Sequence, residues 1–256
     1  MSRSSVFALQ FRTDLLRFWR NPQSRSFTVL LPLVFLFIFA TIFKGSTIVD
    51  GRVVKDTTFY VPGIMALGII SATYVNLTIS IVGQRERGEL KRLRGTPVPA
   101  GFTIASRAVV GVIVAIAMAA LLLVLGKVAY GVRIPGSTSV GLIIALIVGA
   151  AAFSCIAFAV SSLIGSDEAA PPATNLTILP LYFISGVFVP EHQIPALLHD
   201  IAVVFPVYHL AHALLRAFTH THGTAISTTD LLIVAVWGVA AIVFAARRFR
   251  WTPHGD

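Results

Sequence analysis

Six long stretches of this 256-residue chain contain no Asp, Glu, Lys, Arg or His, and they dominate what it can fold into. They cover residues 27–43, 59–83, 108–126, 140–165, 173–189 and 231–246. Uncharged apolar runs of about 18 residues are typical of helices that cross a bilayer. Only 12% of the residues are charged, whereas soluble domains have about a quarter. We therefore predict an all-α, polytopic membrane protein with six transmembrane helices.

Positive charge is concentrated in short blocks beside these stretches, and the net charge is +9. With the N-terminus inside, the inner segments hold fourteen of the twenty Lys and Arg residues and the outer segments hold six. Because Lys and Arg accumulate on the cytoplasmic side of membrane proteins, this bias predicts that both termini are cytoplasmic. Charge at span ends also suits anionic headgroups, so we expect the lipid bilayer, and no nucleic acid, as its partner.

The residues before the first stretch predict an amphipathic helix. Four apolar residues recur at helical spacing and five polar residues occupy the other face. The apolar residues are Phe7, Phe11, Leu15 and Phe18, and the polar residues are Gln10, Thr13, Asp14, Arg17 and Arg20. We interpret residues 1–25 as an interfacial helix in the inner headgroup layer, with a solvated arm as the alternative. Residues 1–256 then form a single transmembrane domain.

The segment QRERGELKRLRGTPVP, residues 84–99, opens a region that holds six of the twenty Lys and Arg residues, between Arg85 and Arg107. Residues 84–94 can form a short helix with leucines on one side and charges on another. Pro97 ends it, because proline cannot continue a helix and disfavours helical backbone at Thr96. We predict that residues 84–101, which we call the elbow, contact a soluble partner. An ordinary inner loop that obeys the charge rule is the alternative.

Residues 190–229 predict short helices at the outer surface. The segments 194–205 and 208–218 are amphipathic but too short to span, so we expect re-entrant helices between the fifth and sixth spans. His209 and His212 have a spacing compatible with metal binding, but no Cys accompanies them. We predict structural or solvated histidines and no metal. A metal site and pH-sensitive gating are the alternatives.

The energy source is not visible in this chain. Gly126-Lys127 is followed by Val128, so the chain has no ATP-binding P-loop. The six stretches also lack the buried acids and histidines that proton-coupled carriers use. Energy must come from another chain, or the protein is a passive pore. Asp167 and Glu168 form the one acidic pair at an inner span end, with no metal cluster or nucleophile beside them, so we predict no enzyme.

The second and fifth stretches carry uncharged polar and aromatic side chains, which suit a lipophilic or amphipathic substrate. As substrate-path residues we predict Tyr74, Asn76, Asn175, Tyr182, Phe183 and Phe188. Packing between helices through Ser and Thr explains the same polar stripes equally well. The path is therefore a hypothesis that depends on where these side chains lie.

Two motifs carry a resemblance to a known family. The first is E-R-G-E-L-K-R-L-R-G-T-P, with an acidic residue, a glycine, spaced leucines and a Thr-Pro pair at Glu86, Gly88, Leu90, Leu93, Thr96 and Pro97. It is similar to the inner loop of ABC-2 type permeases, the membrane subunits of bacterial ATP-driven exporters, including daunorubicin-resistance-like drug exporters. Glu89 departs from the pattern, because the family often has Thr there.

The second motif is S-G-V-F-V-P, residues 185–190, followed by Pro195 and by F-P-V-Y-H and L-L-R. It resembles the end of the family's fifth span, where a Gly-Phe-Pro break precedes two short re-entrant helices and a Pro-aromatic turn. The resemblance implies an outer cap over the translocation path. As outer-gate residues we predict Pro190, Pro206, Tyr208, His209, His212 and Arg216.

The resemblance implies the permease subunit of an ATP-binding-cassette exporter in the bacterial inner membrane, which moves a lipophilic or amphipathic drug or lipid outward. A separate ATPase dimer would bind ATP and Mg²⁺, so this chain would hold no cofactor. A second permease copy or a paralogue would complete the path. The alternatives are a polysaccharide or glycoconjugate exporter permease, a passive channel and a lipid-modifying membrane enzyme.

In that arrangement the ATPase would dock on the elbow and near Asp167 and Glu168. Glu86 would be the polar anchor, and Leu90 and Leu93 would be apolar pegs. As the full set of coupling residues we predict Glu86, Arg87, Gly88, Leu90, Leu93, Thr96, Pro97, Asp167 and Glu168.

Overall fold

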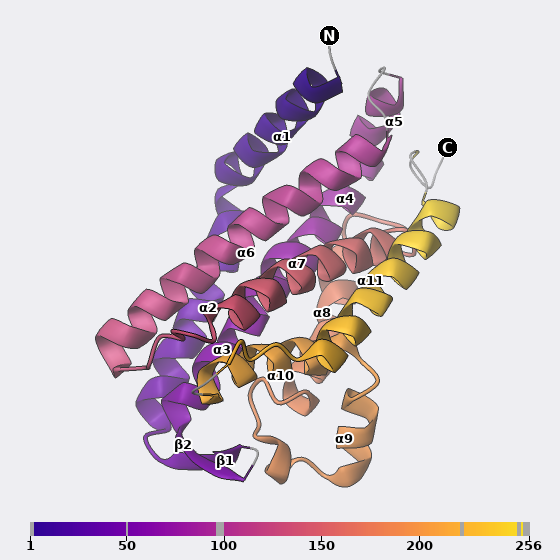
Figure 1. Ribbon diagram of the computed structural model, residues 1–256. Coiled ribbons are helices and arrows are strands. Elements are labelled where there is room, and N and C mark those ends of the chain that lie inside the picture. The colour runs from indigo at the N-terminus through magenta and orange to yellow at the C-terminus, as the bar shows by residue number, and fades with distance from the viewer. Residues whose placement is uncertain (1–2, 50, 96–99, 221–222, 250–251, 253–256) are drawn as a thin grey trace.

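Figure 1 shows the computed structural model of the chain, which describes residues 3–49, 51–95, 100–220, 223–249 and 252. Within these residues the fold consists of helices and one short hairpin. The helices are α1 (Arg3–Arg20), α2 (Pro22–Ile42), α3 (Asp56–Ile70), α4 (Asn76–Glu86), α5 (Glu89–Arg94), α6 (Ala100–Tyr130), α7 (Ser139–Ser161), α8 (Ala170–Ile184), α9 (Ala196–Ala202), α10 (Pro206–Thr219) and α11 (Thr228–Arg248). A π-helix, η1 (Ser71–Val75), joins α3 to α4, and a 3-10 turn, η2 (Glu191–Gln193), precedes α9. The hairpin pairs β1 (Ser46–Val49) antiparallel with β2 (Arg52–Lys55).

Four helical segments are long and apolar enough to cross a bilayer, namely Asp56–Glu86, Gly101–Tyr130, Ser139–Ser161 and Thr228–Arg248. The helices α9 and α10 pass the same test together but are bent by 92° between them. The described part of the chain therefore has four candidate spans, or five if the bent pair counts as one. The predicted number of six spans is not confirmed.

The fifth predicted span forms a helix that is short for a bilayer, since α8 has 15 residues. At a rise of about 1.5 Å per residue, such a helix does not cover a hydrocarbon core of about 30 Å. The predicted end of the fifth span at Val189 is wrong. The helix stops at Ile184 because Gly186 adopts a φ of 73° and turns the chain.

The third predicted span begins too late. The helix α6 starts at Ala100 rather than near Ala108, and it therefore contains Arg107 in its second turn. The Arg107 side chain is only 6% exposed, so a buried charge lies within a helix that the sequence pattern treats as uncharged. Pro206 likewise does not end a helix but begins α10, where its missing N–H has no intrahelical partner to lose.

The helices pack around α7, which contacts α6, α10, α11 and the continuous α3–η1–α4 helix. Small residues allow the closest approaches between helices, as in other membrane bundles. A Cβ atom on Gly238 of α11 would lie 2.9 Å from the Cα atom of Ala152 in α7. A Cβ atom on Gly149 of α7 would lie 2.5 Å from Cδ1 of Leu210 in α10. Larger residues at these glycines would separate α7 from its neighbours.

The bundle has two distinct ends (Figure 1). The helices α1 and α5 and the C-terminal end of α11 lie at one end, which we call the elbow end. The β1–β2 hairpin and α9 lie at the other, the hairpin end. Aromatic rings pack near this second end, where the Phe39 and Phe188 rings stack with centroids 5.3 Å apart and Tyr60 lies 4.9 Å from Phe39. The hairpin end therefore contains a cluster of packed aromatic side chains.

The predicted N-terminal helix is present as α1, and it packs along α6. Its apolar side chains Phe11, Leu15 and Phe18 contact a small buried cluster of Ala72, Val110 and Val114. This face of α1 is covered by protein rather than by headgroups alone. A second set of large apolar side chains on α1 is exposed, namely Leu9, Leu16 and Trp19.

Asp14 of α1 does not lie on an exposed polar face, as the sequence pattern predicts, but is 7% exposed. Its carboxylate accepts a hydrogen bond from the Ser106 hydroxyl at 2.6 Å. The same carboxylate lies 3.9 Å from Nε of Arg107. A buried carboxylate requires such partners, and α6 supplies both. This contact ties α1 to the bundle.

The hairpin and η1 are not predicted from the sequence pattern. The π-helix interrupts the regular hydrogen-bond ladder in the middle of the Asp56–Glu86 helix. Its polar residues Ser71, Thr73 and Tyr74 are all buried. Single π-helical turns inside a longer helix are rare and frequently mark functional positions.

Candidate functional site

The elbow begins in the last turn of α4 and turns at Gly88. Gly88 adopts a φ of 70°, a left-handed conformation that glycine tolerates and other residues rarely adopt. The helix α5 follows at once and ends at Arg94. The single helix predicted over residues 84–94 is therefore two helices joined at a glycine. Thr96 and Pro97, the predicted end of this segment, lie outside the described residues.

Arg85 anchors the elbow from the inside, and its charged side chain is fully buried. Its Nη1 donates a hydrogen bond of 2.8 Å to the carbonyl oxygen of Ser161, and its Nη2 donates to that of Ile164. Ser161 is the last residue of α7 and Ile164 follows in the connection to α8, so the guanidinium lies at a helix end, where backbone acceptors lack helical partners and a cation is favoured. Nε pairs at 2.8 Å with Glu86, whose side chain is 22% exposed. The predicted polar anchor Glu86 is thus a partner of Arg85.

An exposed charge network links the elbow to two other segments. The carboxylate of Glu89 pairs with Arg17 of α1 at 3.1 Å and with Arg87 at 3.0 Å. Nη1 of Arg87 also lies 3.4 Å from Asp167, in the connection between α7 and α8. Gly83 leaves room for this approach, because a Cβ atom there would lie 2.8 Å from Oδ1 of Asp167. Two predicted coupling residues, Arg87 and Asp167, are therefore in contact.

Leu90 lies on the inner side of α5 and is 1% exposed. It belongs to a buried cluster that joins α4, α7 and α11 and contains Ile81, Phe158, Ala159, Ala241 and Ala245. The apolar side chain of Leu90, which the sequence predicts as a peg for the partner ATPase, is thus removed from water within the chain itself. Leu93 is half-buried, and Glu168 is exposed.

The outward surface of the elbow is basic. Arg87, Lys91 and Arg92 are exposed there, at the same end of the bundle as α1 (Figure 1). Exposed ion pairs contribute about 1 kcal/mol or less to stability, so these charges do little to hold the fold. A basic surface on a rigid support is suited to docking an acidic partner surface.

A second polar cluster lies where α10 meets α11. Nδ1 of His209 and Nδ1 of His212 each donate a hydrogen bond of 2.7 Å to the carboxylate of Asp230, which also accepts from Ser227. Nε2 of His209 donates to the carbonyl oxygen of Val203 at 2.7 Å. Both His209 bonds form together only when each ring nitrogen carries a proton. The side chains of both histidines therefore bond to Asp230, at the contact between α10 and α11. Among the described residues, no group of three or more His, Cys, Asp and Glu is arranged to hold a metal ion.

Of the remaining outer-gate residues, Tyr208 contacts this cluster directly. The Tyr208 ring stacks on His212 with centroids 6.0 Å apart and an interplanar angle of 6°. Pro190 and Pro206 are buried; Pro190 immediately precedes η2, and Pro206 is the first residue of α10. Nε of Arg216 is buried and has no hydrogen-bond partner in the part of the chain that the structure describes.

Two of the predicted path residues, Tyr74 in η1 and Tyr182 in α8, lie on elements that contact each other. The hydroxyls of Tyr74 and Thr177 form a hydrogen bond of 2.6 Å that joins these elements. Tyr182 and Ser185 are 3% and 1% exposed, and within the described residues their hydroxyls lack a well-formed hydrogen bond. Buried hydroxyls without partners are costly.

The other predicted path residues lie in different parts of the fold. Asn76 lines a cavity below α1. Asn175 and Phe183 are exposed on α8, the latter by 55%. Phe188 is buried in the aromatic cluster at the hairpin end. Tyr182 and Phe183 both contact the Phe188 ring, with centroids 5.9 and 5.4 Å away, whereas Asn76 lies apart in the cavity beside α1.

The sequence pattern misses three of the residues that hold these sites together. Arg85 and Arg107 are interpreted only as charges that set orientation, and nothing in their spacing reveals that both are buried. The position of Asp230 could have been predicted, because Ser227-Thr228-Thr229-Asp230 matches the S-x-x-D pattern of a helix start.

The fold and the elbow define a class of protein, a multi-pass helical membrane protein with a charged, internally anchored turn at one end. The sequence matches the ABC-2 type transporter family over residues 5–219, and the chain belongs to that family, as its two motifs predict. It is 28% identical over 230 residues to the daunorubicin resistance ABC transporter permease protein DrrB1 of Streptomyces coeruleorubidus, over 87% of this chain and 77% of that protein. It is 26% identical over 153 residues to the probable multidrug ABC transporter permease YbhR of Escherichia coli (strain K12), over 59% of this chain and 41% of that protein.

Proposed function

We propose that the chain is the transmembrane permease subunit of an ABC exporter and moves a lipophilic or amphipathic compound, a drug or a lipid, out of the cytoplasm or the inner leaflet. The family supports the transport role. The names of DrrB1 and YbhR, a daunorubicin resistance permease and a probable multidrug permease, support the substrate class. A separate ATPase subunit binds ATP and Mg²⁺ and supplies the energy. This chain supplies the path through a bacterial cell membrane.

The observation that supports the proposal most strongly is how the elbow is attached to the helical bundle. Arg85 and Leu90 fasten it to the ends of α4, α7 and α11. Its opposite side presents a basic surface to the surroundings. A displacement of α5 by a partner is therefore transmitted directly to three long helices. The coupling set includes Arg87, Glu89 and Asp167, with Thr96 and Pro97 as further candidates.

The exposed face of α8 supports a second permease copy or a paralogue as partner. Asn175 is exposed there beside Leu176, Leu179 and Phe183, which are exposed by 77%, 48% and 55%. A polar amide facing lipid is unfavourable, so this face suits contact with protein or with a water-filled path. Two such faces would enclose a path lined by amide and aromatic side chains.

We infer that the elbow end and both termini are cytoplasmic and that the hairpin end faces outward. This orientation can be measured with single cysteines in a Cys155→Ser background. A cysteine at position 91 should react with a membrane-impermeant thiol reagent only after the cytoplasmic face is opened. A cysteine at position 53 in β2 should react in intact cells. The reverse pattern would contradict the proposed function.

The partner is tested by purifying the tagged chain from its native host in mild detergent. The proposal expects a P-loop ATPase to remain bound to the wild-type chain. Arg87→Glu combined with Arg92→Glu should release it, because the basic surface is reversed. Arg133→Glu, an exposed charge reversal between α6 and α7, is the matched control and should retain the ATPase. A chain that carries no ATPase would point to a passive channel or a membrane enzyme.

A further inference from the structure

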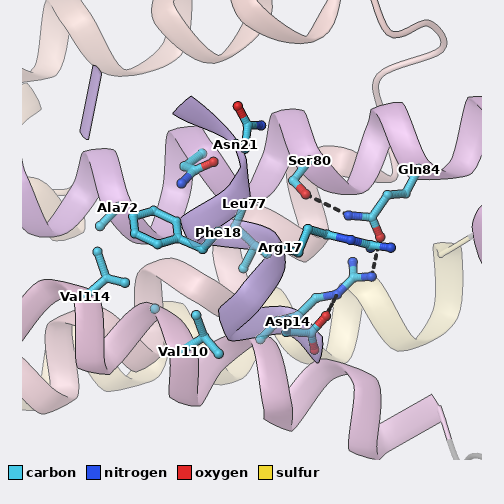
Figure 2. Close-up of a pocket in the computed structure, with 13 residues that line it drawn as sticks. Asp14, Arg17, Phe18, Asn21, Ala72, Leu77, Ser80, Gln84, Val110 and Val114 are labelled. Carbon is cyan, nitrogen blue, oxygen red and sulfur yellow. Dashed lines mark hydrogen bonds and ion pairs between the residues drawn. The ribbon is translucent and has the colours of Figure 1, made fainter. Parts of the chain in front are cut away.

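A cavity of about 80 Å³ lies between α1, the α3–η1–α4 helix and α6, and of the predicted path residues only Asn76 lines it. Figure 2 shows that its lining changes along its length. Ala72, Phe18 and Val114 gather at one end, and Arg17, Ser80, Gln84 and Asp14 gather at the other (Figure 2). The apolar end lies beside η1, in the middle of the Asp56–Glu86 helix, and the polar end lies at the elbow.

A shallow, open hollow on the surface of α1 lies next to this cavity. Its lining residues are Thr13, Leu16, Arg17, Arg20 and Asn21. Arg17 and Asn21 line both spaces, so the hollow and the cavity meet at the C-terminal end of α1. Together they form a site with a wide basic mouth and a narrow apolar extension.

The charges inside the cavity are already compensated. Arg107 donates a hydrogen bond to Gln84 and lies beside the carboxylate of Asp14, and Gln84 donates to Ser80 at 2.7 Å. This closed network gives the polar end a fixed shape. It also means that a ligand does not need to neutralise Arg107.

The charges at the mouth are only partly compensated. Within the part of the chain that the structure describes, Arg17 donates one hydrogen bond, from Nη2 to Glu89, although a guanidinium has five N–H donors. Its side chain is 45% exposed, and Arg20 is exposed as well. Among the described residues, Arg20 forms no ion pair, so the mouth retains donors and positive charge for an anion.

We propose that this site binds an anionic phospholipid of the membrane leaflet at the elbow end, with its phosphate at Arg17 and Arg20 and part of an acyl chain between Phe18, Val110 and Val114. The change from polar to apolar lining runs in the same direction as the change from headgroup to acyl chain in that leaflet. The bound lipid fills the seam between α1 and α6 beside the elbow. The leaflet takes its orientation from the proposed function, but binding itself requires no ATPase.

The test uses the purified full-length chain in detergent, titrated with phosphatidylglycerol or with phosphatidylcholine and measured by native mass spectrometry. Wild-type protein should bind phosphatidylglycerol more tightly. Arg17→Ala with Arg20→Ala should weaken that binding by about fivefold for each arginine lost. Arg12→Ala, which removes an exposed charge from α1 outside both spaces, should change it less than twofold. Inorganic phosphate at millimolar concentration should not displace the lipid.

A second pair of variants tests the apolar end. Val110→Phe fills the cavity and should weaken the binding of both lipids, whereas Val109→Phe adds the same volume on the exposed face of α6 and should not. Equal lipid binding by wild type and the double arginine variant would overturn the proposal. So would an equal loss in Arg12→Ala, or displacement by phosphate alone. None of these results affects the retention of the ATPase, so the two proposals can fail separately.

Discussion

Nη1 of Arg85 lies 2.8 Å from the carbonyl oxygen of Ser161, the last residue of α7. This bond places a buried cation where a transmembrane helix ends and where the elbow begins. It connects the elbow to the helix around which the bundle packs. The partner that we propose for the elbow would therefore act on α7 through a residue that is fully buried.

Arg85→Ala should destabilise the fold, because it leaves the carbonyl oxygens of Ser161 and Ile164 without their donor and removes the partner of Glu86. We expect the free energy of unfolding in mixed micelles to fall by about 3 kcal/mol. Arg92→Ala, which removes an exposed charge from the same elbow, should change it by about 0.5 kcal/mol or less. Equal effects of the two substitutions would show that burial of Arg85 has no energetic consequence.

Glu89→Ala should uncouple α1 from the elbow with little loss of stability. Its ion pairs with Arg17 and Arg87 are exposed and contribute about 1 kcal/mol or less. The expected effect is a several-fold decrease in the stimulation of the partner ATPase by the permease. Glu191→Ala at the hairpin end is the control and should leave stimulation unchanged. Full stimulation in Glu89→Ala would remove this network from the coupling mechanism.

His209→Ala should be more destabilising than His212→Ala. His209 is 4% exposed and donates to two acceptors, whereas the side chain of His212 is 21% exposed. Losses of about 3 and 1 kcal/mol are expected. The fluorescence of Trp237, whose Nε1 donates to the Val204 carbonyl at 3.0 Å, reports on this region. Added Zn²⁺ should restore neither variant, and recovery on adding the metal would reveal a metal site.

Gly238→Ala should force α11 away from α7, because the new Cβ atom would lie 2.9 Å from the Ala152 backbone. We expect a loss of about 2 kcal/mol from this overpacking. Gly101→Ala in α6 meets no atom within 4 Å and should instead stabilise the helix by about 0.5 kcal/mol. Circular dichroism melting of both variants in the same detergent distinguishes them by the sign of the change.

The periodicity of the sequence predicts the helices well because apolar runs and helical spacing are local properties. It finds α1, the long helices and the two short helices before α11. It does not find η1, because nothing in the letters of residues 71–75 separates a π-helical turn from an α-helical one. It also overestimates α8, since the left-handed turn at Gly186 depends on how the chain packs beyond it.

The candidate site could be predicted only in part from the sequence, for a different reason. The charge pattern locates the elbow but not the direction in which each residue points. Leu90 and Arg85 both face inward, and only the positions of α7 and α11 decide that. Glu89 departs from the family pattern and pairs with Arg17 of α1. The sequence could not predict this ion pair, because Arg17 comes from a segment far away in the chain.

The central claim is that this permease transports only when an ATPase drives its elbow. Its most direct test is uptake of a lipophilic fluorescent drug into inside-out proteoliposomes that contain the chain with or without its copurifying ATPase. The account predicts ATP-dependent uptake only when both proteins are present, and its loss in the Arg87→Glu, Arg92→Glu variant. Uptake or ion conduction by the chain alone would contradict it.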